Sequence, residues 1–274
     1  MSSQAEKPAA MVPVAERNAL GAMRDLSFFS GVPQLELREG GHALRVPAFY
    51  YDVTHFSVGF LAPLDKLRGL LPSAEIRPLR ATPRHGLLHL GVFEYRDSDV
   101  GPYNEVSISV AALPGVSAPV GTGLLKAVRE GPTAYVWQLP VTTEIARYLG
   151  VEFYGFPKFL AEIEIQVRDG WGHCRLSEKD ETIFDLRLEL PEAAGYTRYH
   201  YHTLSLREGR VVRAEVSMHG KRGCSRLRNQ VRLVCGEHPL GRQLDGLGVG
   251  RALEVTHFPL MQSILTSPVE SFPV

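Results

Sequence analysis

The chain is organised around the segment Glu152-Phe153-Tyr154-Gly155-Phe156-Pro157-Lys158-Phe159-Leu160-Ala161, which places one lysine among aromatic and aliphatic residues. A lysine amine attacks a ketone only when it is unprotonated, and burial among apolar side chains disfavours the charged ammonium. Pro157 fixes its own φ and donates no backbone hydrogen bond, so the chain just before the lysine is stiff. The segment therefore predicts either a Schiff-base lysine at the wall of a pocket or an edge-strand lysine whose charged head lies in water.

A second segment, residues 86–95, alternates in a way that predicts a strand, and Glu94 ends a face that is otherwise aliphatic. A carboxylate on an apolar face is costly unless it is paired, which suits a proton donor or a partner for a buried cation. The alternative is that the strand ends at Phe93 and that Glu94 turns into water.

A third segment, residues 103–112, also predicts a strand, with aliphatic residues on one face. The opposite face carries Tyr103, Glu105, Ser107 and Ser109. Small hydroxyl side chains around a carboxylate fit the lining of a polar cavity, and they fit a solvated face equally well.

Together these segments resemble the acetoacetate decarboxylase family. The run Gly155-Phe156-Pro157-Lys158, with Glu152 before it and Leu160-Ala161 after it, is similar to the active-site segment of that family. Two upstream acidic stretches, Val92-Phe93-Glu94-Tyr95 and Gly101-Pro102-Tyr103-Asn104-Glu105-Val106, match the family in the same order. The resemblance spans about residues 45 to 260, and it implies a closed β-cone or barrel with the lysine inside.

The resemblance also implies a function, namely a carbon–carbon lyase in which Lys158 forms a Schiff base with the ketone of a small 3-oxo acid such as acetoacetate. Glu94 and Glu105 would place the substrate and move protons. Further pocket candidates are Tyr103, Glu152, Tyr154, Phe156 and Phe159. No cofactor or metal is expected, because the iminium itself accepts the electron pair.

Two departures from the family open alternatives. Phe159 stands where family decarboxylases usually carry a second lysine, and the family's carboxylate-binding arginine has no counterpart near Val53, although Arg45 could replace it. The same lysine could therefore serve an aldolase–dehydratase acting on a pyruvate-like 2-oxo acid, with Tyr154 helping in the pocket. A third reading is a non-catalytic barrel that binds a small molecule.

Composition narrows the class of protein further. The 274 residues carry 30 Lys+Arg and 30 Asp+Glu, so no net charge attracts nucleic acid or membrane. Three scattered cysteines fit a reducing cytoplasm, and neither a signal peptide nor a membrane-spanning stretch is recognisable. We expect a flexible tail over residues 1–20, a single domain over 21–274 and, from the resemblance, a homo-oligomer.

The rest of the sequence predicts a mainly β (α+β) fold of antiparallel strands with a few short peripheral helices. Hairpins are expected at 171–190 and 199–218, and helices at 63–72 and 142–148, the second ending at Gly150. Residues 253–274 are predicted to be a docked tail. Lys158 shares its parity with the polar residues that follow it, so either Pro157 resets the register or that face lines a cavity.

Overall fold

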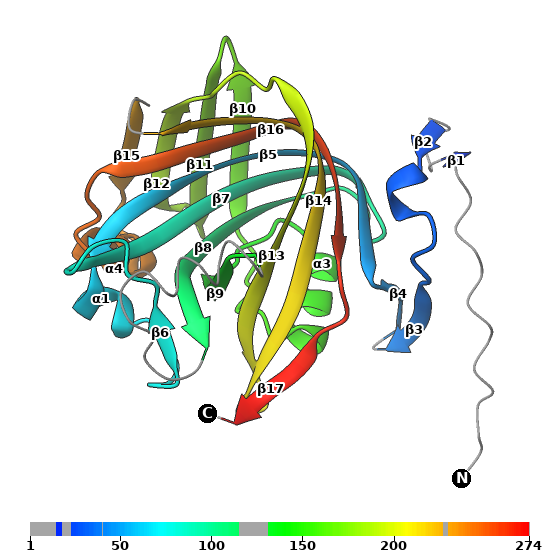
Figure 1. Ribbon diagram of the computed structural model, residues 1–274, viewed down its shortest axis with the longest axis horizontal. Coiled ribbons are helices and arrows are strands. Elements are labelled where there is room, and N and C mark those ends of the chain that lie inside the picture. Colours follow the sequence, from blue (N-terminus) through cyan, green and yellow to red (C-terminus); the bar gives the residue numbers. More distant parts are fainter. Residues whose placement is uncertain (1–14, 18–22, 40, 115–130, 227–229, 274) are drawn as a thin grey trace.

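The computed structural model describes residues 15–17, 23–39, 41–114, 131–226 and 230–273. Its centre is a closed barrel of antiparallel strands with one parallel pairing, between β13 and β9 (Figure 1). Pairing of β13 with β14 closes the ring. The barrel strands are β5 (Ala48–Pro63), β7 (His85–Ser98), β8 (Tyr103–Pro114), β9 (Thr133–Gln138), β13 (Gly195–Arg207), β14 (Arg210–Arg226) and β16 (Ala252–Leu265).

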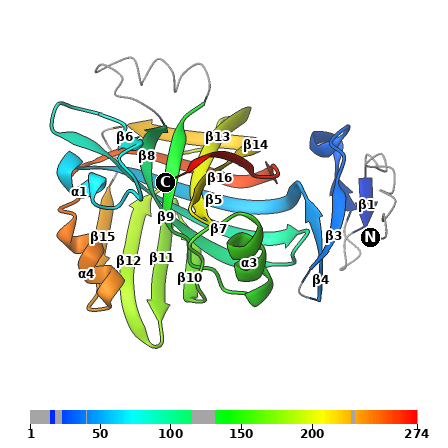
Figure 2. The same cartoon turned by 90° about the horizontal axis from the view of Figure 1, so that it is seen from below.

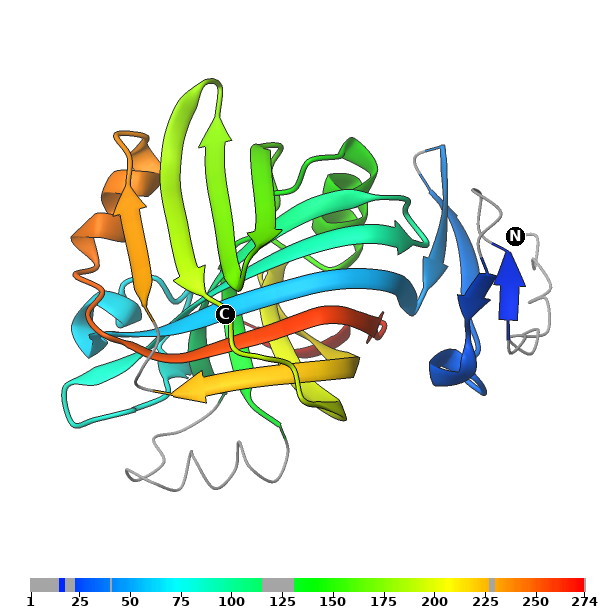
Figure 3. The ribbon, with the colours of Figure 1, turned by 90° about the horizontal axis from the view of Figure 1, so that it is seen from above.

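A second, smaller sheet covers part of the outside of the barrel. Its strands, in spatial order, are β10 (Glu162–Arg168), β11 (Trp171–Glu178), β12 (Glu181–Glu189) and β15 (Val231–Cys235), which cross the barrel strands steeply (Figure 3). Helix α4 (Pro239–Gly246) packs beside this sheet (Figure 2). We call these four strands the outer sheet.

The main hydrophobic core lies between the barrel and the outer sheet. One buried cluster joins the aliphatic face of β7, for example Leu90 and Val92, to Leu176 and Leu186 of the outer sheet. Because side chains alternate along a strand, the aliphatic faces of β5, β7 and β8 point outward and their other faces line the inside of the barrel. The barrel interior holds a second buried cluster of aromatic and aliphatic residues together with the polar side chains of β8.

Short elements complete the described chain. Two ribbons, β1 (Ala15–Arg17) with β2 (Met23–Asp25) and β3 (Leu35–Glu39) with β4 (His42–Val46), stand at one end of the barrel (Figure 1). The remaining elements are η1 (Ser27–Phe29), α1 (Leu64–Arg68), β6 (Ile76–Pro78), α3 (Glu144–Tyr148), the π-helical turn η2 (Leu149–Phe153) and β17 (Val269–Pro273). None of the described helices is long and apolar enough to cross a membrane.

The predicted fold class and both hairpins are confirmed, and two local predictions are wrong. The expected docked tail contains β16, a barrel strand between β5 and β14. Pro259 argues against a strand in the sequence, but in the structure it lies in β16 at a shift of register, where a missing N–H is tolerated. The second helix does not end at Gly150 but continues into η2.

The other chain-level expectations stay predictions, namely the single domain, the homo-oligomer and the cytoplasmic location. Most of the expected tail over residues 1–20 lies outside the described residues, and its described part forms β1. All three cysteines are free thiols.

Candidate active site

The lysine segment is held against the barrel wall by backbone hydrogen bonds to a neighbouring connection. The Val141 N–H donates to the Phe159 oxygen at 2.9 Å, and the Ala161 N–H donates to the Val141 oxygen at 3.0 Å. Val141 also forms an isolated bridge with Glu105 of β8. Lys158 therefore precedes β10 in irregular chain, so the alternation of β10 does not set the direction of its side chain.

Lys158 and Glu105 meet as a buried ion pair. The Lys158 Nζ donates to Glu105 Oε2 at 2.7 Å, and the two side chains are only 6% and 9% exposed. The Tyr95 hydroxyl donates to the other carboxylate oxygen, Oε1, at 3.2 Å. The Nζ atom also lies 5.6 Å from the centre of the Tyr103 ring, within the range of a cation–π contact. Of the two alternatives for Lys158, the structure shows the buried one.

These groups border a cavity of about 60 Å³ inside the barrel, which limits the site to small molecules. Its apolar wall includes Phe93, Val136, Leu139, Phe156, Val216 and Leu265. Its polar wall includes Tyr50, Tyr95, Ser107, Ser109, Tyr201 and Ser263. Lys158 and Glu105 are the only charged residues among the described lining, so the wall is otherwise electrically neutral.

The phenols around the pair remain protonated and can act as hydrogen-bond donors. Burial, followed by the negative charge of Glu105, raises the pKa of Tyr95 well above its usual value. Burial likewise raises the pKa of Tyr50 and of Tyr103. Rings of Tyr50 and Tyr103 pack against Tyr95 at centroid distances of 4.6 and 4.5 Å, which fixes the orientation of its hydroxyl toward Glu105.

Gly150 makes room for the lysine stem. A Cβ atom at this position would lie 2.3 Å from Lys158 Cδ and 2.5 Å from Cε, closer than any real contact. The glycine is therefore required by the approach of Lys158 rather than by a helix end, which explains why the sequence reading of Gly150 was wrong.

The structure brings some of the other predicted pocket residues to the site and places others elsewhere. Phe156 lines the cavity, and the Tyr103 ring flanks the lysine. Phe159 instead packs on the core between the barrel and the outer sheet. Glu152 is exposed on η2, away from the cavity lining. Alternation through irregular chain could not separate these positions.

Tyr154 is a packing residue rather than part of the described lining. It is 1% exposed, and its hydroxyl donates to the Leu265 oxygen at 3.4 Å. Its own backbone oxygen accepts a hydrogen bond from Ser205 Oγ at 2.6 Å. The ring stacks on Phe156 with centroids 5.4 Å apart, so Tyr154 supports a residue that lines the cavity.

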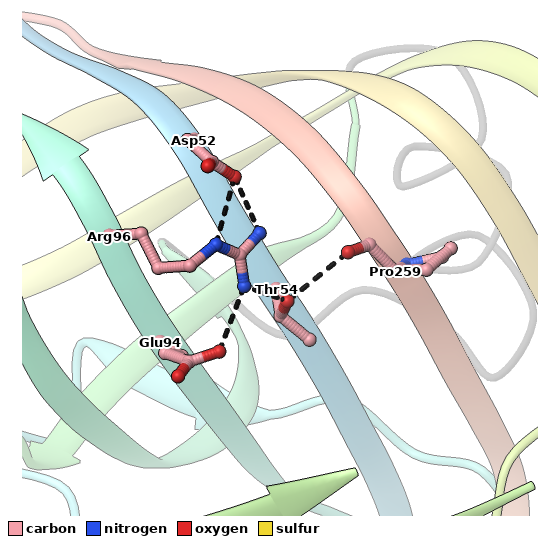
Figure 4. A network of polar contacts seen from close by, with 5 residues as sticks. All are labelled: Asp52, Thr54, Glu94, Arg96 and Pro259. Atoms are coloured by element: carbon pink, nitrogen blue, oxygen red, sulfur yellow. Dashed lines mark hydrogen bonds and ion pairs between the residues drawn. The ribbon is translucent and has the colours of Figure 1, made fainter. Parts of the chain in front are cut away.

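Glu94 corrects the sequence prediction most clearly. Strand β7 continues to Ser98, and Glu94 lies on its outer face with a side chain that is 39% exposed (Figure 4). The Arg96 Nη1 donates to Glu94 Oε2 at 2.8 Å, and the same guanidinium also bonds Asp52 and Thr54. The aliphatic face that ends at Glu94 is the outside of the barrel, so Glu94 is separated from Lys158 by the wall.

Arg45 does not replace the missing arginine of the family in this structure. Its side chain is 53% exposed, its Nη1 lies 3.9 Å from Asp99 Oδ1, and Arg45 is not part of the cavity lining. Sequence reasoning also missed Tyr95 and Ser263 as lining residues. Tyr95 could have been found from its parity on β7, opposite to the aliphatic residues, whereas nothing in the sequence pairs Ser263 with the site.

A family comparison agrees with this geometry. Residues 33–260 match the sequence model of the family described as acetoacetate decarboxylase (ADC). The chain belongs to the acetoacetate decarboxylase family. No curated protein matches it significantly.

Solved structures of acetoacetate decarboxylase family members and similar enzymes share the fold at low sequence identity. One acetoacetate decarboxylase is 17% identical, with a TM-score of 0.64 over 84% of this chain and 91% of its own. The acetoacetate decarboxylase of Legionella pneumophila is 13% identical, with a TM-score of 0.63 over 83% and 88%. The enduracididine biosynthesis enzyme MppR, solved in complex with pyruvate, is 13% identical, with a TM-score of 0.56 over 81% and 89%.

Proposed function

We propose that this acetoacetate decarboxylase family member is a lyase that forms a Schiff base between Lys158 and a small ketone. The reaction that we propose for it is the decarboxylation of a 3-oxo acid such as acetoacetate. The observation that carries the proposal is the buried contact of 2.7 Å between Lys158 Nζ and Glu105 Oε2 at the wall of the cavity. The carboxylate can accept the ammonium proton and can then pair with the cationic iminium, so one residue serves both states of the lysine.

The reaction begins when Glu105 accepts a proton from Lys158, because only the neutral amine attacks the ketone carbon. Water leaves, and the product is a protonated iminium that pairs with the carboxylate. The bond between the α-carbon and the carboxylate then breaks, its electron pair moves to the iminium nitrogen, and CO2 leaves an enamine. A proton added to the enamine carbon restores the iminium, and water releases the ketone and the amine, with one proton taken from solvent overall.

Tyr95 supports these steps from the other side of Glu105. Its hydroxyl donates to Oε1, so the carboxylate keeps Oε2 directed at the lysine nitrogen. Because the pKa of Tyr95 is raised, this phenol stays a donor throughout the neutral pH range.

A second candidate is an aldolase–dehydratase that uses the same lysine with a pyruvate-like 2-oxo acid. In that reaction the iminium loses a proton from the methyl carbon, and the resulting enamine adds to an aldehyde. Two observations support this second candidate. Phe159 stands in place of the family's second lysine, and the fold is similar to that of MppR, which was solved with pyruvate.

Borohydride trapping separates these functions in one experiment. Incubation with acetoacetate and borohydride is expected to add the reduced ketone product to Lys158, detected by peptide mass, with release of CO2 in the absence of borohydride. A pyruvate adduct without CO2 release from acetoacetate supports the aldolase. The variant Lys158→Ala is the negative control, and Lys221→Ala on β14 is the positive one. If neither compound modifies Lys158, the result favours the third alternative, a non-catalytic barrel that binds a small molecule.

A further inference from the structure

Three serines on the cavity wall have hydroxyl groups without a partner among the described residues. Ser107 and Ser109 follow Glu105 on the inner face of β8, and Ser263 lies on β16. Ser109 and Ser263 are each 4% exposed. Their backbones pair in the strand ladders, but none of the three hydroxyl groups hydrogen-bonds to another residue in the described part of the chain.

By contrast, two neighbouring hydroxyl groups on the barrel strands have hydrogen-bond partners within the protein. Ser205 Oγ donates to the Tyr154 oxygen at 2.6 Å, and Thr203 Oγ1 donates to the Ala214 oxygen at 3.3 Å. Buried hydroxyls are normally hydrogen-bonded, because leaving one unpaired costs free energy. The three cavity serines are therefore placed to bond a group that enters the cavity, either water or the oxygen atoms of a ligand.

Two of the three, Ser107 and Ser109, follow Glu105 along the inner face of β8, and Ser263 lines the cavity from β16. Residues two apart on a strand face are separated by about 7 Å, so Ser107 is one such step from Glu105 and Ser109 is two. A ketone carbon bound to Lys158 would sit at the Glu105 end of this face. A short arm that extends from that carbon along β8 would meet the Ser107 hydroxyl, and only a longer arm would reach Ser109.

Charge determines how that arm is recognised. The described wall has no cation besides Lys158, whose charge is balanced by Glu105 before and after the Schiff base forms. We propose that Ser107, Ser109 and Ser263 form a hydroxyl subsite that binds the oxygen-bearing arm of a small ketone through hydrogen bonds rather than through an ion pair. The inference rests on the proposed Schiff base at Lys158, and it assigns the substrate class as small ketones with an oxygenated arm.

Three ketones of similar size test the subsite in the borohydride assay: acetoacetate, its neutral amide acetoacetamide, and 2-butanone, whose arm has no oxygen. The measured quantity is the ketone concentration that gives half of the maximal trapping rate. We expect the values for acetoacetate and acetoacetamide to agree within about 10-fold, and the value for 2-butanone to be higher. The double variant Ser107→Ala/Ser109→Ala is expected to raise the value for acetoacetamide about 2-fold to 12-fold, the factor for one lost hydrogen bond, because its short arm reaches Ser107 but not Ser109. Its value for 2-butanone should not change.

The matched control is Ser57→Ala, because Ser57 is 2% exposed on β5 but is not part of the cavity lining. A preference for acetoacetate over acetoacetamide above about 100-fold, or equal losses for acetoacetamide and 2-butanone, would overturn the subsite while leaving the Schiff base intact. If 2-butanone and the other ketones all fail to modify Lys158, the proposed function itself fails, and the subsite fails with it. If the double variant does not fold, the two single serine variants and the comparison of the three ketones on the wild-type protein test the subsite instead.

Discussion

At the scale of single residues, the decisive contact joins Lys158 to Glu105, and each group is costly to bury without the other. Removing one partner of a buried pair leaves an uncompensated charge, so the pair constrains both side chains to one geometry. The neutral wall around them strengthens this constraint, because no other charged residue in the described lining offers a substitute partner.

Glu105→Gln tests the carboxylate as the proton acceptor. The amide cannot take the proton from Lys158, so we expect kcat for the decarboxylation to fall about 10²–10⁴-fold, the usual contribution of a general base. The measurement is CO2 release from acetoacetate together with the rate of borohydride trapping. Glu94→Gln is the matched control on the outer face of β7 and should stay near wild-type activity. Equal losses in the two variants would contradict the assignment.

Gly150→Ala tests the space that the lysine stem needs. A Cβ atom would meet Lys158 Cδ at 2.3 Å, so the stem must move and Nζ must leave its position at Glu105. A displacement of about 1 Å at a reacting group can cost about 10²-fold in rate, which we expect for trapping at Lys158. Gly246→Ala, where a Cβ meets nothing within 4 Å, should trap at the wild-type rate. Wild-type trapping by Gly150→Ala would refute the argument.

At the scale of elements, alternation in the sequence predicted β7, β8 and both hairpins but not which face of a strand lies inside the barrel. A role for Glu94 at the site requires the aliphatic face of β7 to face the pocket, but this face packs under the outer sheet. Without knowledge of the inner face, the sequence analysis assigns Glu94 to the site and does not identify Tyr95. The sequence does not show whether the polar face of β8 lines a cavity or faces solvent. The closure of the barrel decides this, and closure depends on pairings between distant strands.

Leu186→Ala measures the core between barrel and outer sheet. Leu186 on β12 is fully buried, so the truncation leaves a cavity and should lower the free energy of unfolding by about 2–5 kcal/mol. Denaturant unfolding gives the value, and borohydride trapping below the transition should remain at the wild-type level, because this core lies on the far side of the wall. Val167→Ala on β10, which is 45% exposed, should change stability by less than about 0.5 kcal/mol. A slower trapping rate in Leu186→Ala would show that the two sides are coupled.

At the scale of the whole molecule, the barrel depends on contacts between the two ends of the chain. The Thr54 hydroxyl bonds the Pro259 oxygen across 205 residues of sequence, where β5 pairs with β16. Such pairings leave no local pattern in the sequence, so the sequence predicts only a docked tail over residues 253–274. The resemblance to a family supplied Lys158, Glu105 and the closed barrel, whereas the residues that complete the wall follow from the register of distant strands.

Stability of the whole barrel should depend on pH through His55. Burial lowers the pKa of this residue to about 3, and its Nδ1 contacts the Val92 oxygen at 3.0 Å. In the unfolded chain its pKa is about 6.5, so between pH 6.5 and pH 3 the unfolded state binds more protons and stability falls as the pH falls. The contribution of His55 is about 1.4 kcal/mol per pH unit in this window.

His55→Gln should therefore flatten the acid side of the stability profile by about 1.4 kcal/mol per pH unit. Urea unfolding between pH 4 and pH 7 measures the slope, and exposed His200→Gln serves as the control. Burial also lowers the pKa of His257, so part of the slope should persist in the variant. An unchanged slope in His55→Gln would contradict the assignment.

Because β8 turns its aliphatic residues toward the outer sheet and Ser107 and Ser109 toward the cavity, mutations on its two faces act on different properties. Odd positions of β8, such as Ser107 and Ser109, can be exchanged for other small residues without disturbing the layer that holds the fold together. Selection, or an engineer, can thus retune which carbonyl compounds are accepted while the architecture is inherited intact. Divergence within such a lineage should accumulate on one parity of the strands, around a lysine and a glutamate that stay fixed.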